Sequence, residues 1–309
     1  MRPIQAIRAK AFVTTIILTA VAVLSTVLYS LREERPPKTQ PAAPSPVVTP
    51  AQPEGVSGPW RQVFGDEFSV DVLDPEKWST CYPHGNWYGC SSGELQWYLP
   101  ENVRTNAGYL DLVAEADPFQ VDNNPPRFFD YRSGMISTLP LHHGEAPKFT
   151  FRYGFTEIRA RLPHGSGLFP AFWLVNTAGG SEEIDIIENL GHDTTRLYQT
   201  VHWLDPLTGQ GDGDLQSFNG AGLVDYSGSF HVFGLDWQPD HIAWYVDGSL
   251  ARTTFTDQAR IPQVDMGLIA NLAVGGSWAC SQHTPQPCPA PAAFPASYSI
   301  DYIRVWQAA

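Results

Sequence analysis

Short runs of apolar residues, separated by turn residues, recur along most of the chain after residue 60. Within residues 154–162, two sets of side chains alternate at a period of two, which predicts a β-strand. An Asp-Gly pair at 247–248 lies between two such runs and predicts a hairpin. Comparable runs occupy residues 109–114, 230–237, 241–246, 267–274 and 298–306. Because no long helical periodicity is visible, the pattern predicts an all-β sandwich of antiparallel sheets with a concave face.

One acidic stretch does not fit simple alternation: residues 183–188 read Glu-Ile-Asp-Ile-Ile-Glu. Glu183 and Asp185 share a strand face, whereas Glu188 would point to the opposite one. A β-bulge at the two isoleucines before Glu188 would absorb one residue and return it to the shared face. A core does not tolerate three carboxyl groups, so this wall is expected to line a cleft. The alternative is an acidic, solvated edge strand.

The chemistry of such a wall follows from the repulsion between its charges. Close carboxylates repel each other, which raises the pKa of one of them. A charged carboxylate beside a neutral carboxylic acid is what glycoside hydrolysis requires.

The N-terminal region has the pattern of a membrane-directed segment. An uncharged run from Ala11 to Leu31 follows Arg2, Arg8 and Lys10. Its 21 residues are enough to cross a bilayer, and the preceding basic residues keep the N-terminus inside. An uncleaved anchor is favoured, with a cleaved signal peptide as the alternative. We therefore expect a signal-anchor or signal peptide over residues 1–31, a Pro- and Ala-rich disordered linker over 32–58 and an extracytoplasmic domain over 59–309, membrane-anchored or secreted.

Composition narrows the class of ligand. The chain carries a net charge of −13, only 17% charged residues and ten Trp among 12% aromatics. An acidic domain is a poor partner for nucleic acid. Abundant aromatic side chains suit a neutral sugar polymer, so a polysaccharide is the expected partner of a monomeric protein.

The four cysteines form two close pairs in the sequence, Cys81 with Cys90 and Cys280 with Cys288. Outside the cytoplasm, two local disulfides are expected from this proximity, although three pairings are possible. A zinc site that uses all four thiolates is the alternative, but the spacings are not those of a zinc ribbon.

The acidic stretch resembles the active-site signature of glycoside hydrolase family 16, in its bulged, laminarinase-like form. Further similarities follow in order at residues 66–68, 94–98, 131–134, 162–174, 244–248, 271–278 and 301–306, so that the resemblance spans about residues 60–307. It implies a concanavalin-like β-jelly-roll sandwich of two curved antiparallel sheets with a concave substrate cleft. It also implies a retaining endo-glycosidase that hydrolyses β-glucan at β-1,3 linkages.

Other functions remain open at this point. They are a hydrolase or transglycosylase of another polysaccharide, such as mixed-linkage glucan, galactan or agar, and a non-catalytic glucan-binding protein.

The resemblance implies separate roles for the three acids. Glu183 would be the nucleophile, Glu188 the acid and base, and Asp185 the group that tunes their pKa values. A retaining pair is expected to stand about 5–5.5 Å apart. Two residues depart from the family pattern: Phe169 stands where Trp is common, and Glu182 stands where Gly often precedes the nucleophile.

Sugar-binding and metal-binding positions are also implied. Trp173 is expected to floor the cleft, with a core Trp as the alternative. His202 is expected near Glu188, on a neighbouring strand, with a structural His as the alternative. The expected substrate-binding set is Trp173, His202, Trp278, Phe169, Arg132, Asn102, Trp97 and Tyr98. A structural calcium would be held by the Asp301 side chain and backbone oxygens of Glu67 and Gly108. No catalytic metal or organic cofactor is expected.

Overall fold

The computed structural model describes residues 52–82, 93–106, 108–121, 126–142, 144–178, 180–205, 207–209, 211–219 and 224–309. The expected N-terminal helix and most of the expected linker lie outside this part of the chain. Within the described ranges, no helix has the length and apolar character needed to cross a membrane. Packing begins before the expected boundary at residue 59, because the backbone N–H of Glu54 donates to the buried carboxyl of Glu157 at 3.0 Å.

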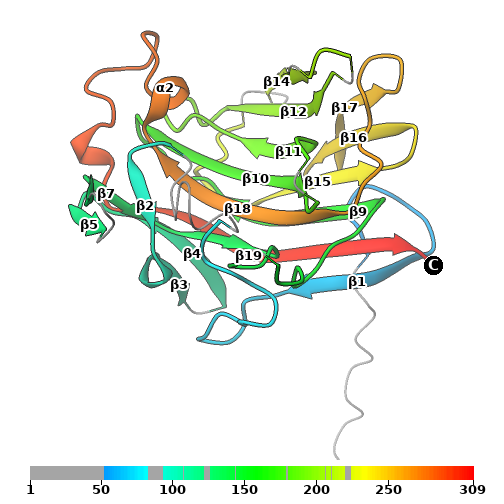
Figure 1. Ribbon diagram of the computed structural model, residues 1–309, viewed down its shortest axis with the longest axis horizontal. Coiled ribbons are helices and arrows are strands. Elements are labelled where there is room, and N and C mark those ends of the chain that lie inside the picture. Colours follow the sequence, from blue (N-terminus) through cyan, green and yellow to red (C-terminus); the bar gives the residue numbers. More distant parts are fainter. Residues whose placement is uncertain are drawn as a thin grey trace, which may run out of the picture. The chain divides into compact units, whose positions relative to one another are not determined.

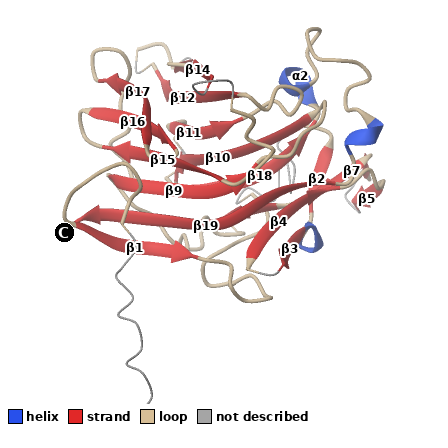
Figure 2. Cartoon of the chain, turned by 180° about the vertical axis from the view of Figure 1, so that it is seen from behind, coloured by secondary structure: helices blue, strands red, loops and turns tan. Residues whose placement is uncertain are grey.

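Among the described residues, almost all regular structure is β-strand, and the helices there are limited to single turns (Figure 2). The strands are β1 (Trp60–Asp66), β2 (Gln96–Tyr98), β3 (Val103–Asn106), β4 (Tyr109–Ala114), β5 (Phe119–Val121), β6 (Arg127–Phe129), β7 (Tyr131–Ser133), β8 (Met135–Ser137), β9 (Gly154–Arg161), β10 (Leu168–Asn176), β11 (Glu183–Glu188), β12 (Arg196–Leu204), β13 (Gly211–Gly213), β14 (Gln216–Asn219), β15 (His231–Trp237), β16 (His241–Val246), β17 (Ser249–Phe255), β18 (Met266–Val274) and β19 (Ala296–Ala308). The helical turns are η1 (Pro100–Asn102), α2 (Gly276–Ala279) and η2 (Pro291–Ala293).

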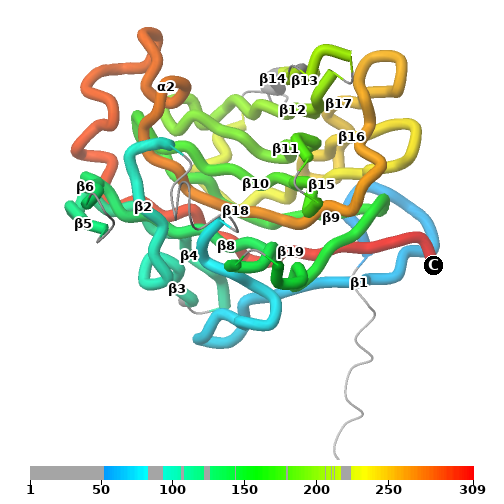
Figure 3. The backbone as a smooth tube through the Cα atoms, in the orientation of Figure 1, coloured from blue at the N-terminus to red at the C-terminus, as the bar shows by residue number. Residues whose placement is uncertain are grey.

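Two large antiparallel sheets face each other (Figure 1). The outer sheet has the strand order β17-β16-β15-β9-β19-β4-β3, with β1 paired to β19. The inner sheet has the order β13-β12-β11-β10-β18-β8, with β14 paired to β12. Its two edge strands, β13 and β8, are labelled in Figure 3. Two small sheets, the parallel pair β2–β7 and the antiparallel pair β5–β6, complete the described fold. The expected all-β jelly-roll sandwich is confirmed.

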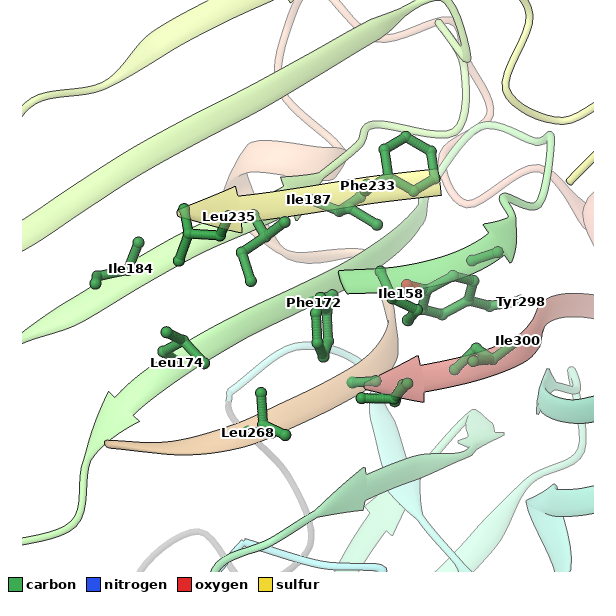
Figure 4. Packing of buried hydrophobic residues seen from close by; sticks show 14 of the residues in the cluster. Ile158, Phe172, Leu174, Ile184, Ile187, Phe233, Leu235, Leu268, Tyr298 and Ile300 are labelled. Atoms are coloured by element: carbon green, nitrogen blue, oxygen red, sulfur yellow. The ribbon is translucent and has the colours of Figure 1, made fainter. Parts of the chain in front are cut away.

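The space between the large sheets holds the hydrophobic core. Phe172 and Leu174 on β10 and Ile184 on β11 pack with Phe233 and Leu235 on β15 (Figure 4). All five side chains are fully buried, and burial of each stabilises the fold by about 1.5–3 kcal/mol. Because strand side chains alternate, this packing turns the intervening residues of β10 and β11 to the opposite face.

The predicted hairpin is confirmed between β16 and β17. Asp247 and Gly248 form its two-residue turn, and both have positive φ values of 48° and 70°. A two-residue turn with positive φ at both positions suits the right-handed twist of the strands that it joins.

The predicted β-bulge is confirmed in β11. Trp173 on β10 faces Asp185, and Phe172 faces Ile187, so that Ile186 has no partner on β10. The register with β12 also shifts between Asp185 and Glu188. All the isoleucines of the strand are fully buried, so the extra residue joins the core and the three acids stay on the other face.

Candidate active site

Three carboxyl groups line the open face of β11, which lies between β10 and β12. The Glu183 side chain is 33% exposed, whereas the Asp185 side chain between the two glutamates is only 2% exposed. Asp185 faces Trp173 on β10 and Thr200 on β12. The sequence expectation that these acids share one wall is therefore met.

Asp185 and Glu183 share a hydrogen bond beside a histidine. His202 Nε2 lies 3.2 Å from Asp185 Oδ2 and 3.9 Å from Glu183 Oε1. The hydrogen bond between the two carboxyl groups lowers the pKa of Glu183 and raises that of Asp185. This interaction therefore favours the ionised form of Glu183 and the protonated form of Asp185.

Burial is the main cause of the shifted pKa values of all three acids. Loss of solvation raises the pKa of Glu183, and the nearby His202 opposes this effect. Desolvation raises the pKa of Asp185 well above its usual range, and the charge of Glu183 adds to the shift. Glu188 also has a strongly raised pKa, first from burial and then from the negative charges of Asp185 and Glu183. Glu188 and Asp185 therefore tend to hold protons while Glu183 ionises first.

The partner of Glu188 is Thr200, which donates from Oγ1 to Glu188 Oε2 at 3.3 Å. His202 was expected near Glu188 on a neighbouring strand. His202 does lie on the neighbouring strand β12, but the carboxyl groups closest to it are those of Asp185 and Glu183. The reason is that His202 stands opposite Glu183 in the ladder.

The closeness of these groups also bears on metal binding. One ligand atom each from Glu183, Asp185 and His202 lies within 4.8 Å of the others. The carboxyl–carboxyl hydrogen bond already accounts for the approach of the two acids, so the geometry alone does not indicate a metal ion.

Trp173 is held beside Asp185 by a chain of hydrogen bonds. Its indole N–H donates to Asn271 Oδ1 at 2.8 Å, and Asn271 Nδ2 donates to the Tyr98 hydroxyl at 3.1 Å. Tyr98 is fully buried. The expectation that Tyr98 contacts sugar is corrected accordingly, because it supports Trp173 from below.

A pocket of about 280 Å³ adjoins the site at Trp173 and Val175. Val175 faces Glu183 across the ladder, which places the pocket next to that acid. Tyr82 forms an aromatic wall, and its ring centroid lies 6.4 Å from that of Trp173. His142 and Glu145 add polar groups to the lining, so the pocket combines apolar ring surface with hydrogen-bonding groups, as a sugar site does.

An aromatic cluster lies at the other end of the acidic wall. Trp278, in the short helix α2, meets Phe169 edge-on at 5.2 Å and Tyr198 at 5.0 Å between ring centroids. Tyr198 faces Glu188 in the ladder. The expected disulfide between Cys280 and Cys288 is present directly after α2.

The disulfide decides between the two interpretations of the cysteines. Since Cys280 and Cys288 are bonded to each other, a zinc site that needs all four thiolates is excluded. Cys81 is also disulfide-bonded, and Cys90 lies outside the described residues.

The more distant sugar contacts are not supported by the structure. Asn102 is fully buried and donates its amide to Val113 O and Glu115 Oε2, so it holds the fold instead. Trp97 is 8% exposed and packs against Phe129. Arg132, on β7, forms an ion pair with Asp117 at 3.2 Å, and its guanidinium lies over the ring of Phe119.

Glu182, which stands where the family often has Gly, is bound at the end of β10. Its carboxylate accepts a hydrogen bond from Asn176 Nδ2 at 2.7 Å at the end of β10. This fourth carboxylate therefore links the two ends of the β10–β11 connection.

The expected calcium ligands do not fit a divalent cation as they stand. The Asp301 carboxylate forms an ion pair with the Arg159 guanidinium. The positive charge of this guanidinium repels a calcium ion at the same carboxylate. The Glu67 carboxylate is paired with Arg304 at 2.7 Å, and Gly108 lies in the β3–β4 turn. These residues therefore do not fit the calcium that the resemblance implies, and no chemical step below depends on it.

Two of the site residues that the sequence does not single out, Thr200 and Tyr198, lie on β12. They alternate with His202 along β12 and therefore share its face. That alternation was the available signal, but neither side chain is acidic or unusual enough to attract attention alone.

Comparisons with known proteins agree with the geometry. The profile of the family described as Glycosyl hydrolases family 16 matches residues 118–303, from β5 to β19. The chain is 33% identical over 272 residues to the Beta-glucanase of Rhodothermus marinus, covering 80% of this chain and 85% of that protein. It is 29% identical over 301 residues to Glucan endo-1,3-beta-glucosidase A1 of Niallia circulans, covering 86% of this chain but 42% of that protein.

A solved structure has a similar fold. The catalytic domain of an endo-1,3-beta-glucanase (laminarinase) from Thermotoga petrophila RKU-1 has a TM-score of 0.68 and 32% identity. The match covers 82% of this chain and 99% of that domain. The resemblance found in the motifs is thereby confirmed.

The ion pair at Asp301 leads to a prediction about metal removal. EDTA should leave the Tm of the protein unchanged, because Arg159 already supplies the positive charge that calcium would bring. A calcium ion present at 100 times its Kd would contribute about 2.7 kcal/mol, or roughly 5 °C or more of Tm for a domain of this size. A drop of that size after EDTA treatment, reversed by calcium and not by magnesium, would show that the site binds calcium.

Proposed function

The chain belongs to Glycosyl hydrolases family 16, and on that premise we propose that it is a retaining endo-glycosidase that cleaves β-1,3 linkages in β-glucan. The observation that carries this proposal is the bulged β11, which presents Glu183, Asp185 and Glu188 on one face with unequal proton affinities. The names of the enzymes to which the chain is similar refer to β-glucan and to its 1,3 linkages.

In the first step, ionised Glu183 attacks the anomeric carbon of the sugar and forms a glycosyl-enzyme ester. Protonated Glu188 gives its proton to the departing glycosidic oxygen. Asp185 keeps its own proton and directs it at Glu183, which favours the ionised form of the nucleophile. A separation of about 5–5.5 Å between the two glutamate carboxyl groups stays the expectation for a retaining pair.

In the second step, the charges around Glu188 change its role. Once Glu183 is an ester it no longer carries a negative charge, and one of the causes that raise the pKa of Glu188 disappears. The pKa of Glu188 falls, so the ionised carboxylate takes a proton from water, which attacks the ester and releases the sugar with retained configuration.

The polymer substrate would extend beyond the reacting sugar in both directions. The pocket lined by Tyr82 and Trp173 offers a stacking surface next to Glu183. The cluster of Phe169, Tyr198 and Trp278 offers a second one beyond Glu188. Binding surface on both sides of the reacting bond suits cleavage within a chain.

We also propose an extracytoplasmic location, secreted or membrane-anchored. A disulfide in a described loop supports an oxidising compartment, and a polysaccharide substrate is consistent with it. The N-terminal anchor stays a prediction.

The nucleophile can be tested by Glu183→Gln. We expect kcat on a linear β-1,3-glucan to fall by about 10³-fold or more, with Tm preserved. Products from a panel of β-1,3-glucan, mixed-linkage glucan, β-galactan and agar would be separated by chromatography. Unchanged activity in Glu183→Gln would refute the mechanism. Cleavage of a galactan or agar with an inert β-1,3-glucan would refute the substrate assignment.

The tuning role of Asp185 can be tested by Asp185→Asn. The amide keeps a donor toward Glu183 but cannot ionise, so the negative charge that Asp185 acquires as pH rises no longer raises the pKa of Glu188. Because Glu188 must be protonated to act, the basic limb of the pH dependence of kcat/KM should move to lower pH, and kcat should fall. Asp265→Asn, at an exposed ion pair, is the control. A basic limb that stays in place would contradict the coupling of Asp185 to Glu188.

The pocket can be tested by Tyr82→Ala. Loss of a stacking wall worth about 1 kcal/mol should raise KM for a long β-1,3-oligosaccharide roughly fivefold. The kcat value should stay constant, because the pocket binds the ground state and the transition state alike. Phe128→Ala removes an aromatic ring that is 75% exposed on β6, and it should change neither constant. Equal KM values for Tyr82→Ala and the parent would exclude the pocket from binding.

A further inference from the structure

The bulge that gathers the three acids is fastened from the opposite sheet. In β11 the regular ladder is interrupted after Asp185. The carbonyl oxygen of Asp185 accepts a 2.8 Å hydrogen bond from the indole N–H of Trp244. Trp244 is fully buried and belongs to β16 of the outer sheet. Its N–H thus crosses the core to reach the backbone of the middle acid.

A second contact fastens the neighbouring strand from the same hairpin. Arg252 on β17 lies 4.2 Å from the centroid of the Trp244 ring and donates to the carbonyl of Gln199 at 2.9 Å. Its guanidinium also forms an ion pair with Asp214 at 2.6 Å. Gln199 directly precedes Thr200, the donor to Glu188. The β16–β17 hairpin therefore holds the backbone next to two groups of the site.

We propose that Trp244 is a positioning residue for catalysis, whose N–H fixes the bulge and thereby the Asp185 carboxyl between Glu183 and Glu188. This inference rests on the proposed glycosidase function. Among the groups of the site, Trp244 meets the backbone carbonyl of Asp185. Its ring is buried in the core between the sheets, so it acts through the strand and not on the sugar. Functional groups must be held within about 0.5 Å of the productive geometry, and a backbone carbonyl that is free to turn does not meet that limit.

The simpler interpretation is that Trp244 only satisfies a buried carbonyl and stabilises the core. The fold contains a matched control for it. Trp237, on the adjacent strand β15, is also fully buried, and its indole N–H donates to the carbonyl of Pro262 at 3.1 Å. That carbonyl lies outside the site, so a purely structural role predicts the same behaviour for both residues.

The experiment replaces each of the two tryptophans by Phe and by benzothienylalanine, in which sulfur takes the place of the N–H at nearly constant shape. At Trp244, both replacements should lower kcat on β-1,3-glucan by about tenfold to a hundredfold with KM unchanged. The basic limb of the pH profile should also move to lower pH, because a displaced Asp185 raises the pKa of Glu188 less. At Trp237, both replacements should lower Tm and leave kcat and the pH profile unchanged.

Equal effects on kcat at the two positions, or a loss of Tm alone at Trp244, would overturn the proposal. A direct measurement separates this result from failure of the proposed function. Carbon-13 NMR titration of labelled Asp and Glu carboxyls reports the pKa values of the site without any substrate. If the Trp244 variants shift the titrations of Asp185 and Glu188 but the parent protein cleaves no glycan, the substrate assignment is overturned and the positioning role stands. If the titrations do not shift, the positioning role is overturned.

Discussion

A β-strand turns successive side chains to opposite faces, and the chemistry of this site depends on how β11 meets that constraint. Glu183 and Asp185 satisfy it without help, whereas Glu188 lies an odd number of residues beyond Glu183. The bulge at Ile186 restores the shared face while keeping that side chain in the core. The same extra residue breaks the ladder at the Asp185 carbonyl, so gathering the acids and fastening the backbone are two consequences of one insertion.

Placing three acids side by side on a partly desolvated face of β11 destabilises the folded state. Their folded pKa values are raised, so the folded form binds protons more tightly than the unfolded chain does. The cost is absent below the unfolded pKa values, and it grows as pH rises toward and through the folded ones. The buried isoleucines on the other face of β11 offset it, because each contributes about 1.5–3 kcal/mol. One strand therefore carries both the charge that chemistry needs and the apolar surface that keeps it folded.

The parts of this structure that follow from local periodicity could be read from the sequence. The strands at 109–114 and 241–246 match their predicted bounds, and the bulge was visible as a misfit in spacing. Tertiary contacts could not be read in this way. Tyr98 and Asn102 were expected to contact sugar, but the packing of other strands buries them. His202 lay on the expected strand, yet the register decided which acid it meets.

The outer sheet is easily regarded as a scaffold that only closes the core. The outer sheet also positions the site, because the Trp244 indole and the Arg252 guanidinium both donate hydrogen bonds to backbone carbonyls beside the acids. Apolar packing between sheets is tolerant of small sliding motions, since it has no preferred direction. A hydrogen bond between them has a preferred length and angle, so it defines the position of β11 more narrowly than packing does. The precision of the acidic wall is therefore set partly by residues on the far side of the core.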